Sequence, residues 1–434
     1  MTGPGETTRE PDRMHEQFAT IYSEPPTHLV EAPGRINLIG EHIDYCKLPV
    51  LPMAIERRLR LYLRPRTDTE VRVTSTAWDY SLRTFTLSEA IQRYPAGDWG
   101  NYVKAAAQVI VRHLSSGGTS RAESNSSLRG VDILIDSDLP LAAGLSSSSA
   151  LLIACALGLL AANGQELPPL DAPGPDGARS ERIRAHFAGE LARGERYVGT
   201  AGGGMDQTVC LLARAGAALR IEFEPFRVTP VQIPSEWRFV VAHSLTQAEK
   251  SKSALTVYNQ RARQCREAEE AVTDTLTRSA SSGGYPGLVA QYDVHELMVA
   301  AEDSLHPMFL RRFRHVVSEA QRVEDAEVAL KAEDLSRFGG LMDASHASLR
   351  DDFEVSTPEL DELVGIMLEA GAAGARLTGA GLGGCAIGVC TRDQVESVCE
   401  ALTTRFYERQ YAPGEVTEYP FVAHPSAGAS VTRL

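Results

Sequence analysis

The sequence predicts a protein of two domains, each built from strands and helices. The chain has 434 residues, which is more than a single hydrophobic core normally organises. Short segments of alternating polarity in the first half are typical of half-buried strands: Leu59–Leu63, Val71–Thr74 and Val131–Ile135. Past Arg220 a second group of strand-like segments precedes long charged helical patterns. We therefore place a domain boundary near residue 220.

The sequence divides into an N-terminal lead-in and two domains. Residues 1–27 are rich in Pro, Glu, Thr and Gly, so we expect a poorly ordered lead-in. The first domain is then expected to cover residues 28–220 and the second residues 221–434. Three stretches rich in Ser, Gly or Pro are expected to be surface loops: Ser115–Ser127, Glu166–Arg179 and Ser279–Pro286.

The helices are predicted from apolar spacing. Asn101–Leu114 carries apolar residues at helical intervals, and Ala150–Ala162 is apolar nearly all round, which indicates a buried helix. From about residue 220 onward, two strands are expected at Leu219–Phe223 and Phe239–His243, followed by long helices between Glu249 and Leu335. A last helix is expected at Thr357–Ala370 and a last strand at Ala386–Cys390.

Composition excludes several classes of function. The formal net charge of −14 argues against nucleic acid as a general partner, because phosphate backbones attract basic surfaces. Seven cysteines without a CxxC spacing fit reduced thiols, and a structural zinc site is not indicated. The polar N-terminus does not resemble a signal peptide, and no apolar stretch has the length of a membrane span. We expect a soluble cytoplasmic protein without a membrane partner.

The segment Gly34–Tyr45 carries the most chemistry. Within GRINLIGEHIDY stand one guanidinium, two carboxylates and an imidazole. Such a group suits a site that holds a polyhydroxylated ligand beside an anion. Taken alone, the segment could equally be a strand with a solvated charged edge.

The segment Leu139–Ala150 suits the binding of phosphate. Its small residues let a backbone approach phosphates closely, and the start of the following helix favours negative charge. Serine hydroxyls can add hydrogen bonds or a Mg²⁺ ligand. The sequence contains neither GxxxxGK[ST] nor GxSxG, so a common P-loop and a hydrolase elbow are not indicated. A serine run that only caps a core helix is the alternative.

Two further glycine-rich segments complete the set. Residues 379–384 formally spell GxGxxG, but a strand-like segment follows instead of a helix, so a dinucleotide fingerprint is not supported. Gly374–Cys385 is interpreted as a turn that lets two backbones meet beside a ligand, or as a plain hairpin turn. In Gly202–Gln207, three glycines would let Asp206 project into a cleft, although an Asp in this position is also a common helix cap.

Together these segments resemble the GHMP family of small-molecule kinases, and within it the galactokinases. Asp98–Lys104 and Ser348–Ser356 are similar to the same family, and the likeness runs from about residue 28 to about residue 405. The resemblance implies an α+β GHMP kinase fold. Its N-terminal α/β domain has a mixed sheet like that of ribosomal protein S5 domain 2, its C-terminal α+β domain has an antiparallel sheet, and the active site lies between them.

The resemblance also implies phosphoryl transfer from MgATP to the C1 hydroxyl of a galactose-type sugar, with a role for each matching residue. Asp206 matches the catalytic base and Arg35 its partner. Five residues match the sugar pocket: Glu41, His42, Asp44, Gly203 and Tyr258. Seven consecutive residues match the ATP phosphate loop: Gly144, Leu145, Ser146, Ser147, Ser148, Ser149 and Ala150. Trp99 is expected near the adenine, and Ser148 and Glu195 as the Mg²⁺ ligands.

Two alternatives stay open. The segment Cys46–Pro49 differs in sequence from most galactokinases. The first alternative is therefore an N-acetylgalactosamine kinase, which would use the same chemistry with more room at C2 of the sugar. A sensor that binds ATP and sugar without transfer is the alternative from another class, but such sensors are expected to lose the phosphate loop or the Asp–Arg pair, and both are intact here. We expect a monomer.

Overall fold

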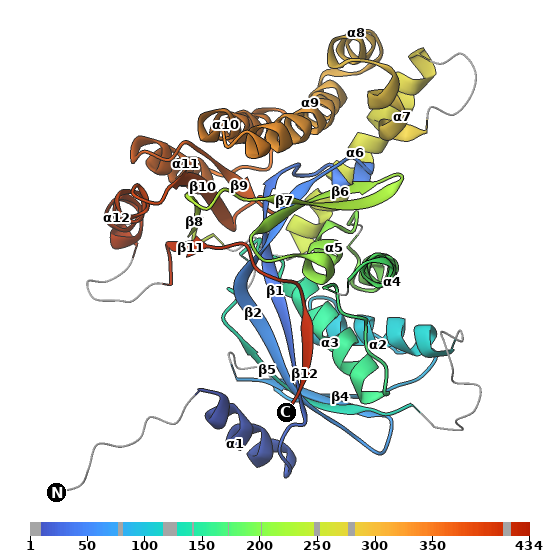
Figure 1. Cartoon of the computed structure of the whole chain (residues 1–434). Coiled ribbons are helices and arrows are strands. Elements are labelled where there is room, and N and C mark those ends of the chain that lie inside the picture. Colours follow the sequence, from blue (N-terminus) through green and yellow to red (C-terminus); the bar gives the residue numbers. More distant parts are fainter. Residues whose placement is uncertain are drawn as a thin grey trace, which may run out of the picture.

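Two sheets organise the chain (Figure 1). The computed structural model describes residues 10–76, 81–115, 128–140, 143–171, 173–200, 202–246, 252–276, 283–410 and 418–434. The first sheet has the order β12-β1-β2-β5-β3-β4, and its neighbours are antiparallel except the parallel pair β3 and β5. Its strands are β1 (His28–Ile39), β2 (Leu51–Pro65), β3 (Glu70–Ser75), β4 (Arg83–Thr86), β5 (Val131–Ser137) and β12 (Ser430–Arg433). The mixed sheet predicted for the N-terminal domain is therefore present.

Several helices accompany this sheet, and one of them lies at the centre of its core. They include α2 (Gly100–Ser115), α3 (Ser147–Ala162), α4 (Pro175–Gly194) and α5 (Met205–Leu212). The helix α3 packs against β1, β2 and α2, and nearly all of its side chains are buried, because it has an apolar residue at almost every position. The buried helix predicted for Ala150–Ala162 is confirmed, and it begins at Ser147.

The second sheet is antiparallel throughout. Its order is β11-β8-β10-β9, with β8 (Trp237–His243), β9 (Gly374–Thr378), β10 (Cys385–Thr391) and β11 (Phe421–Ala423). A separate hairpin, β6 (Ala217–Phe223) and β7 (Phe226–Gln232), lies against β2, and Ile221 forms an isolated antiparallel bridge with Val50, the residue before β2. The helices of this half are α6 (Lys252–Leu276), α7 (Gly284–Gln291), α8 (Val294–Ser304), α9 (Pro307–Lys331), α10 (Leu335–Asp351), α11 (Pro358–Glu369) and α12 (Val395–Arg405).

The expectation of a poorly ordered lead-in is wrong from residue 10 onward. The helix α1 (Glu10–Tyr22) buries Met14, Phe18 and Tyr22 against Tyr62 and Leu134 of the first sheet. These three side chains stand four residues apart, so they form one apolar stripe on the helix. Figure 1 shows α1 on the side of the sheet away from α2 and α3. Residues 1–9 lie outside the described residues.

The domain boundary predicted near residue 220 falls inside the strand β6. The C-terminal end of the chain also returns to the first sheet, where Val431 of β12 pairs with Val30 of β1. The first domain therefore includes residues from both ends of the chain. A four-residue strand carries too weak a pattern for a sequence to reveal such long-range pairing.

Several predicted limits need correction. The expected loop Glu166–Arg179 ends early, because α4 begins at Pro175, and proline is well suited to the first turn of a helix. The expected loop Ser279–Pro286 overlaps the start of α7 at Gly284, and its residues 279–282 lie outside the described part of the chain, as do residues 116–127. The helix predicted as the last, at residues 357–370, is followed by α12. Within the described ranges, no helix has both the length and the apolar character that a bilayer span requires.

Candidate active site

One cleft collects residues from all four glycine- and charge-rich motifs. It holds about 1050 Å³, counting its open mouth, which is the upper end of the range for small-molecule sites. The residues that the sequence predicted for the site and that line the cleft are Arg35, Glu41, His42, Asp44, Gly144, Ser146, Ser147, Ser149, Glu195, Asp206 and Tyr258. The tertiary structure therefore brings together segments that are far apart in the chain.

The other predicted residues stand behind the cleft or away from it. The described residues that line the cleft do not include Leu145, Ser148, Ala150, Gly203 and Trp99. The side chain of Leu145 is buried, and its carbonyl accepts a hydrogen bond from the Arg35 backbone N–H at 3.1 Å. The Gly203 N–H donates to Oδ2 of Asp44 at 2.9 Å, so Gly203 acts on the cleft through that carboxylate. Trp99 packs against the core beside α2, and its expected contact with adenine stays a prediction.

A three-residue group lies where the motifs meet. Nε of Arg35 donates to Oδ1 of Asp206 at 2.8 Å, and a second guanidinium nitrogen donates to the carbonyl of Gly144. The hydroxyl of Ser146 donates to the other oxygen of Asp206. The carboxylate therefore accepts from a cation on one side and from a hydroxyl of the phosphate loop on the other.

The local backbone explains how this group forms. The ladder between β1 and β2 shifts its register between Pro33 and Arg35, which re-aims a strand locally. At Gly34, an added Cβ would come within 2.3 Å of the Leu139 side chain, so glycine lets β1 lie against the phosphate loop. Asp206 stands in the first turn of α5, but the N-cap residue is Gly204. Asp206 is thus free of the capping role that was its alternative.

Burial changes the acid–base properties of the sugar motif. Burial raises the pKa of Glu41 to about 7, although Arg376 and Arg35 act in the opposite direction. Burial and the nearby Asp206 carboxylate raise the pKa of Asp44 to about 6. The guanidinium of Arg35 has a raised pKa despite its burial, because Asp206 and Glu41 stabilise its positive charge. The cleft therefore holds the Arg35 cation near two carboxyl groups, Glu41 and Asp44, whose pKa values are raised toward neutrality.

His42 is held by the protein at both ring nitrogens. Burial lowers its pKa to about 3, so the imidazole is neutral. Since Nε2 lies 3.1 Å from the Ala380 carbonyl, it carries the proton and donates it, and Nδ1 accepts from the Tyr45 hydroxyl at 3.2 Å. The ring packs against Tyr258 and Phe353. His42 thus shapes the wall of the cleft, and its expected contact with a sugar hydroxyl stays a prediction.

The turn Gly374–Cys385, which was predicted to let two backbones meet, lies against the phosphate loop, a partner that the sequence did not specify. Gly144 has φ of 75° and Gly379 has φ of 86°, and a Cβ on Gly379 would lie 2.6 Å from the Gly144 carbonyl oxygen. Only glycine allows both this backbone conformation and this approach. The turn is also a hairpin, since it joins the antiparallel strands β9 and β10.

The phosphate loop ends at an uncapped helix start. Ser146 is the N-cap of α3, has φ of 65°, and makes no side-chain cap bond. Its hydroxyl is directed to Asp206 instead. The first backbone N–H groups of a helix have no partner within the helix, and they attract anions. The alternative, in which the serine run only caps a core helix, therefore does not describe Ser146.

Oxygen atoms suited to Mg²⁺ stand at one end of the cleft. The hydroxyl of Ser149 donates to Oε1 of Glu195 at 2.7 Å and lies 3.5 Å from Oδ2 of Asp206. Mg²⁺ prefers oxygen ligands and commonly takes one or two from protein, with phosphate oxygens and water completing its shell. The predicted ligand Glu195 fits this chemistry. The neighbour of Ser148, Ser149, contacts Glu195, and the metal role of Ser148 stays a prediction.

Residues that were not predicted also line the cleft. They include Thr200, Gln207 and Leu255. Gln207 follows Asp206 directly, and its buried amide nitrogen has no partner among the described residues, so its place in the motif could have drawn attention to it. Leu255 lies on α6, and no local pattern in the sequence marks it.

Family models match most of the chain. Residues 16–65 match the galactokinase galactose-binding signature, residues 101–214 the GHMP kinases N terminal domain, and residues 326–408 the GHMP kinases C terminal model. The galactokinase of Roseiflexus sp. (strain RS-1) is 37% identical over 404 residues, which is 91% of either chain.

Solved structures agree with this assignment. The galactokinase of Lactococcus lactis in complex with galactose has a TM-score of 0.79 and 28% sequence identity, covering 96% of this chain and 98% of that one. The mevalonate kinase of Methanococcus jannaschii, at 18% identity and a TM-score of 0.58, covers 92% of this chain and 98% of its own, and it shares the fold alone. The predicted two-domain α+β fold is confirmed, and the chain belongs to the galactokinase family of GHMP kinases.

Proposed function

We propose that the protein transfers the γ-phosphoryl group of MgATP to the C1 hydroxyl of galactose, which gives galactose 1-phosphate and ADP. The observation that carries this proposal is the position of Asp206. It lies between Arg35 and Ser146, where the sugar motif meets the phosphate loop. The galactose-binding signature and the galactokinase relatives support galactose as the sugar.

The residues of the cleft suit each step of this transfer. Asp206 accepts the proton of the C1 hydroxyl as that oxygen forms its bond to the γ-phosphorus and the bond to the leaving ADP breaks. Arg35 stabilises the negative charge that spreads over the transferred group. Its second bond, to the Gly144 carbonyl, keeps the guanidinium beside the phosphate loop. Positioning and charge account for most of the rate in such reactions.

Asp44 and Glu41 are assigned to the sugar hydroxyls, with Gly203, Tyr258 and His42 completing the pocket. One oxygen of Asp44 accepts the N–H of Gly203, which orients the carboxylate. A site built to pair each hydroxyl rejects an epimer strongly, because a mismatch leaves buried polar groups without partners. The axial C4 hydroxyl is the group that separates galactose from glucose.

The nucleotide is assigned to residues 144–150, with Trp99 near the adenine. Ser148 and Glu195 would hold Mg²⁺, which neutralises phosphate charge when it is bound. The proposal includes a monomer, in which one chain supplies the residues that line the cleft. It also places the protein in the cytoplasm, where its seven free cysteines stay reduced.

A coupled ADP-release assay tests the proposal with galactose, N-acetylgalactosamine, glucose and arabinose. Galactose should give the highest kcat/KM, and glucose should be rejected by at least about 10³. A higher kcat/KM for N-acetylgalactosamine than for galactose would change the proposed substrate and leave the proposed phosphoryl transfer unchanged. If the protein binds MgATP but turns over none of the four sugars, the kinase assignment fails and a sensor takes its place.

A further inference from the structure

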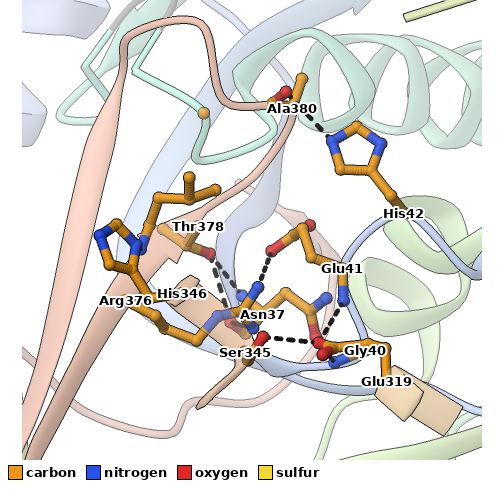
Figure 2. Close-up of polar contacts among 12 residues, drawn as sticks. Asn37, Gly40, Glu41, His42, Glu319, Ser345, His346, Arg376, Thr378 and Ala380 are labelled. Carbon is orange, nitrogen blue, oxygen red and sulfur yellow. Dashed lines mark hydrogen bonds and ion pairs between the residues drawn. The ribbon is translucent and has the colours of Figure 1, made fainter. Parts of the chain in front are cut away.

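A carboxylate outside the cleft holds the backbone of the sugar motif. Glu319 lies on α9 and is fully buried. Its Oε1 accepts the backbone N–H of Gly40 at 2.9 Å and that of Glu41 at 3.2 Å (Figure 2). These two residues form the turn after β1, just before His42. A residue of the second half of the chain therefore fixes the backbone from which the predicted sugar ligands project.

The surroundings of Glu319 keep it ionised. Burial alone would favour the neutral acid, but Arg322 and Arg376 outweigh it and hold the pKa of Glu319 well below its ordinary value. Nε of Arg322 donates to Oε2 at 2.7 Å, and the hydroxyl of Ser345 on α10 donates to Oε1 at 2.7 Å. An anion accepts backbone N–H bonds more strongly than a neutral group does. Each oxygen of this carboxylate is thus occupied by donors.

Glu41 is held from the same half of the chain at two more points. The Arg376 side chain, fully buried on β9, donates to Oε2 of Glu41 at 3.1 Å and to the Asn37 carbonyl at 3.2 Å (Figure 2). Nε2 of His315 on α9 lies 3.0 Å from the Glu41 carbonyl oxygen. The N–H, the carbonyl and the carboxylate of Glu41 therefore all meet partners from the second half of the chain.

The turn requires such support because its backbone is unusual. Gly40 has φ of 95° and His42 has φ of 61°, and the left-handed region is unfavourable for a residue other than glycine. Strained conformations persist only where the surroundings hold them. The bonds from Glu319 supply this restraint on the two residues directly before His42.

We propose that Glu319 is a positioning residue for sugar recognition, which clamps the Gly40–Glu41 turn so that Glu41 and His42 face the sugar. The inference rests on the proposed assignment of Glu41 to the sugar. It makes galactose affinity depend on how α9 packs against the end of β1. Phosphoryl transfer and ATP binding use other residues and should be affected much less.

The experiment measures steady-state kinetics of Glu319→Gln in the full-length protein. Loss of a charged acceptor for two backbone donors should raise the KM for galactose about tenfold. The kcat and the KM for ATP should stay within about twofold. Glu324→Gln is the matched control, because Glu324 lies on the same helix and pairs with Arg220 of β6. This control should leave both KM values unchanged.

A double-mutant comparison separates positioning from general damage. If Glu319 acts through Glu41, adding Glu319→Gln to Glu41→Gln should raise the galactose KM little further. Ser345→Ala removes one donor to Glu319 and replaces Glu319→Gln as the test if that variant does not fold. The KM for galactose should then rise about threefold. An unchanged galactose KM in the folded variants, an equal rise in both KM values, or fully additive effects would overturn the inference. If Glu41→Gln itself leaves the galactose KM unchanged, the sugar assignment fails first.

Discussion

Nε of Arg35 donates to Oδ1 of Asp206 at 2.8 Å although 171 residues separate them in the chain. One residue comes from β1, and the other from the first turn of α5. The Arg35 side chain is 8% exposed and that of Asp206 is 25% exposed, so the pair opens to the cleft on the side of the carboxylate. A base that must reach a substrate proton needs this exposure, whereas its cation is best shielded from water.

Replacing the proposed base should stop phosphoryl transfer without preventing the binding of ATP. Asp206→Asn keeps the shape of the side chain but cannot accept the sugar proton, so kcat should fall by about 10² to 10⁴. ADP release measures turnover, and calorimetry with an ATP analogue should show nearly unchanged binding. Asp325→Asn, at an ion pair on α9, is the control and should keep full activity. A near-normal kcat in Asp206→Asn would remove Asp206 from this role.

Two adjacent glycines should respond differently to the same change. A Cβ at Gly203 would lie 2.2 Å from the carbonyl carbon of Asp44, whereas a Cβ at Gly202 meets only the Tyr258 hydroxyl at 3.8 Å. Gly203→Ala must therefore displace Asp44, and kcat/KM for galactose should fall at least about tenfold. Gly202→Ala should stay within about threefold of the unmodified protein. Equal effects of the two variants would contradict the contact between Gly203 and Asp44 as a determinant of the site.

The metal requirement should depend on Glu195. Glu195→Gln removes a charged oxygen ligand, so the Mg²⁺ concentration for half-maximal rate should rise about tenfold or more. Titration of Mg²⁺ at saturating galactose and fixed ATP measures this change. Glu190→Gln, one turn earlier near the end of α4, changes a side chain that pairs with His113 and serves as the control. An unchanged Mg²⁺ dependence in Glu195→Gln would exclude this residue as a ligand.

The raised pKa of Asp44 predicts how stability changes with pH. The native state holds the Asp44 proton up to about pH 6, whereas the unfolded chain releases it near the ordinary value of 3.8. The stabilisation from this group is therefore complete below the unfolded value and is lost as pH rises through 6, by roughly 3 kcal/mol at most. Asp44→Asn removes this titration. Its Tm should rise relative to the unmodified protein between pH 5 and pH 8, and a Tm difference that is independent of pH would contradict the prediction.

Local sequence determined the strands, the buried helix and the chemistry of the site. Parts of the strands β2, β3 and β5 follow from alternation, and the helix α3 follows from an apolar composition. Arg35, Asp206 and the phosphate loop could be named because glycines, a serine run and charged residues stand in short motifs. A close approach of two backbones at the turn Gly374–Cys385 could be expected, since glycine alone tolerates such an approach. These features depend on residues that are neighbours in the chain.

Tertiary structure alone decided which distant groups complete the site. The pairing of β12 with β1, the burial of Glu319 under Gly40 and the bond from Nε2 of His42 to the Ala380 carbonyl have no local signal. A buried glutamate in the middle of a charged helix resembles any solvated one in sequence, because its partners come from other elements. The sequence by itself therefore determined the family, and its motifs supplied the groups that we propose to react. Only packing between the two halves of the chain decided how the sugar motif is held, since hydrogen bonds to a turn depend on what folds against it.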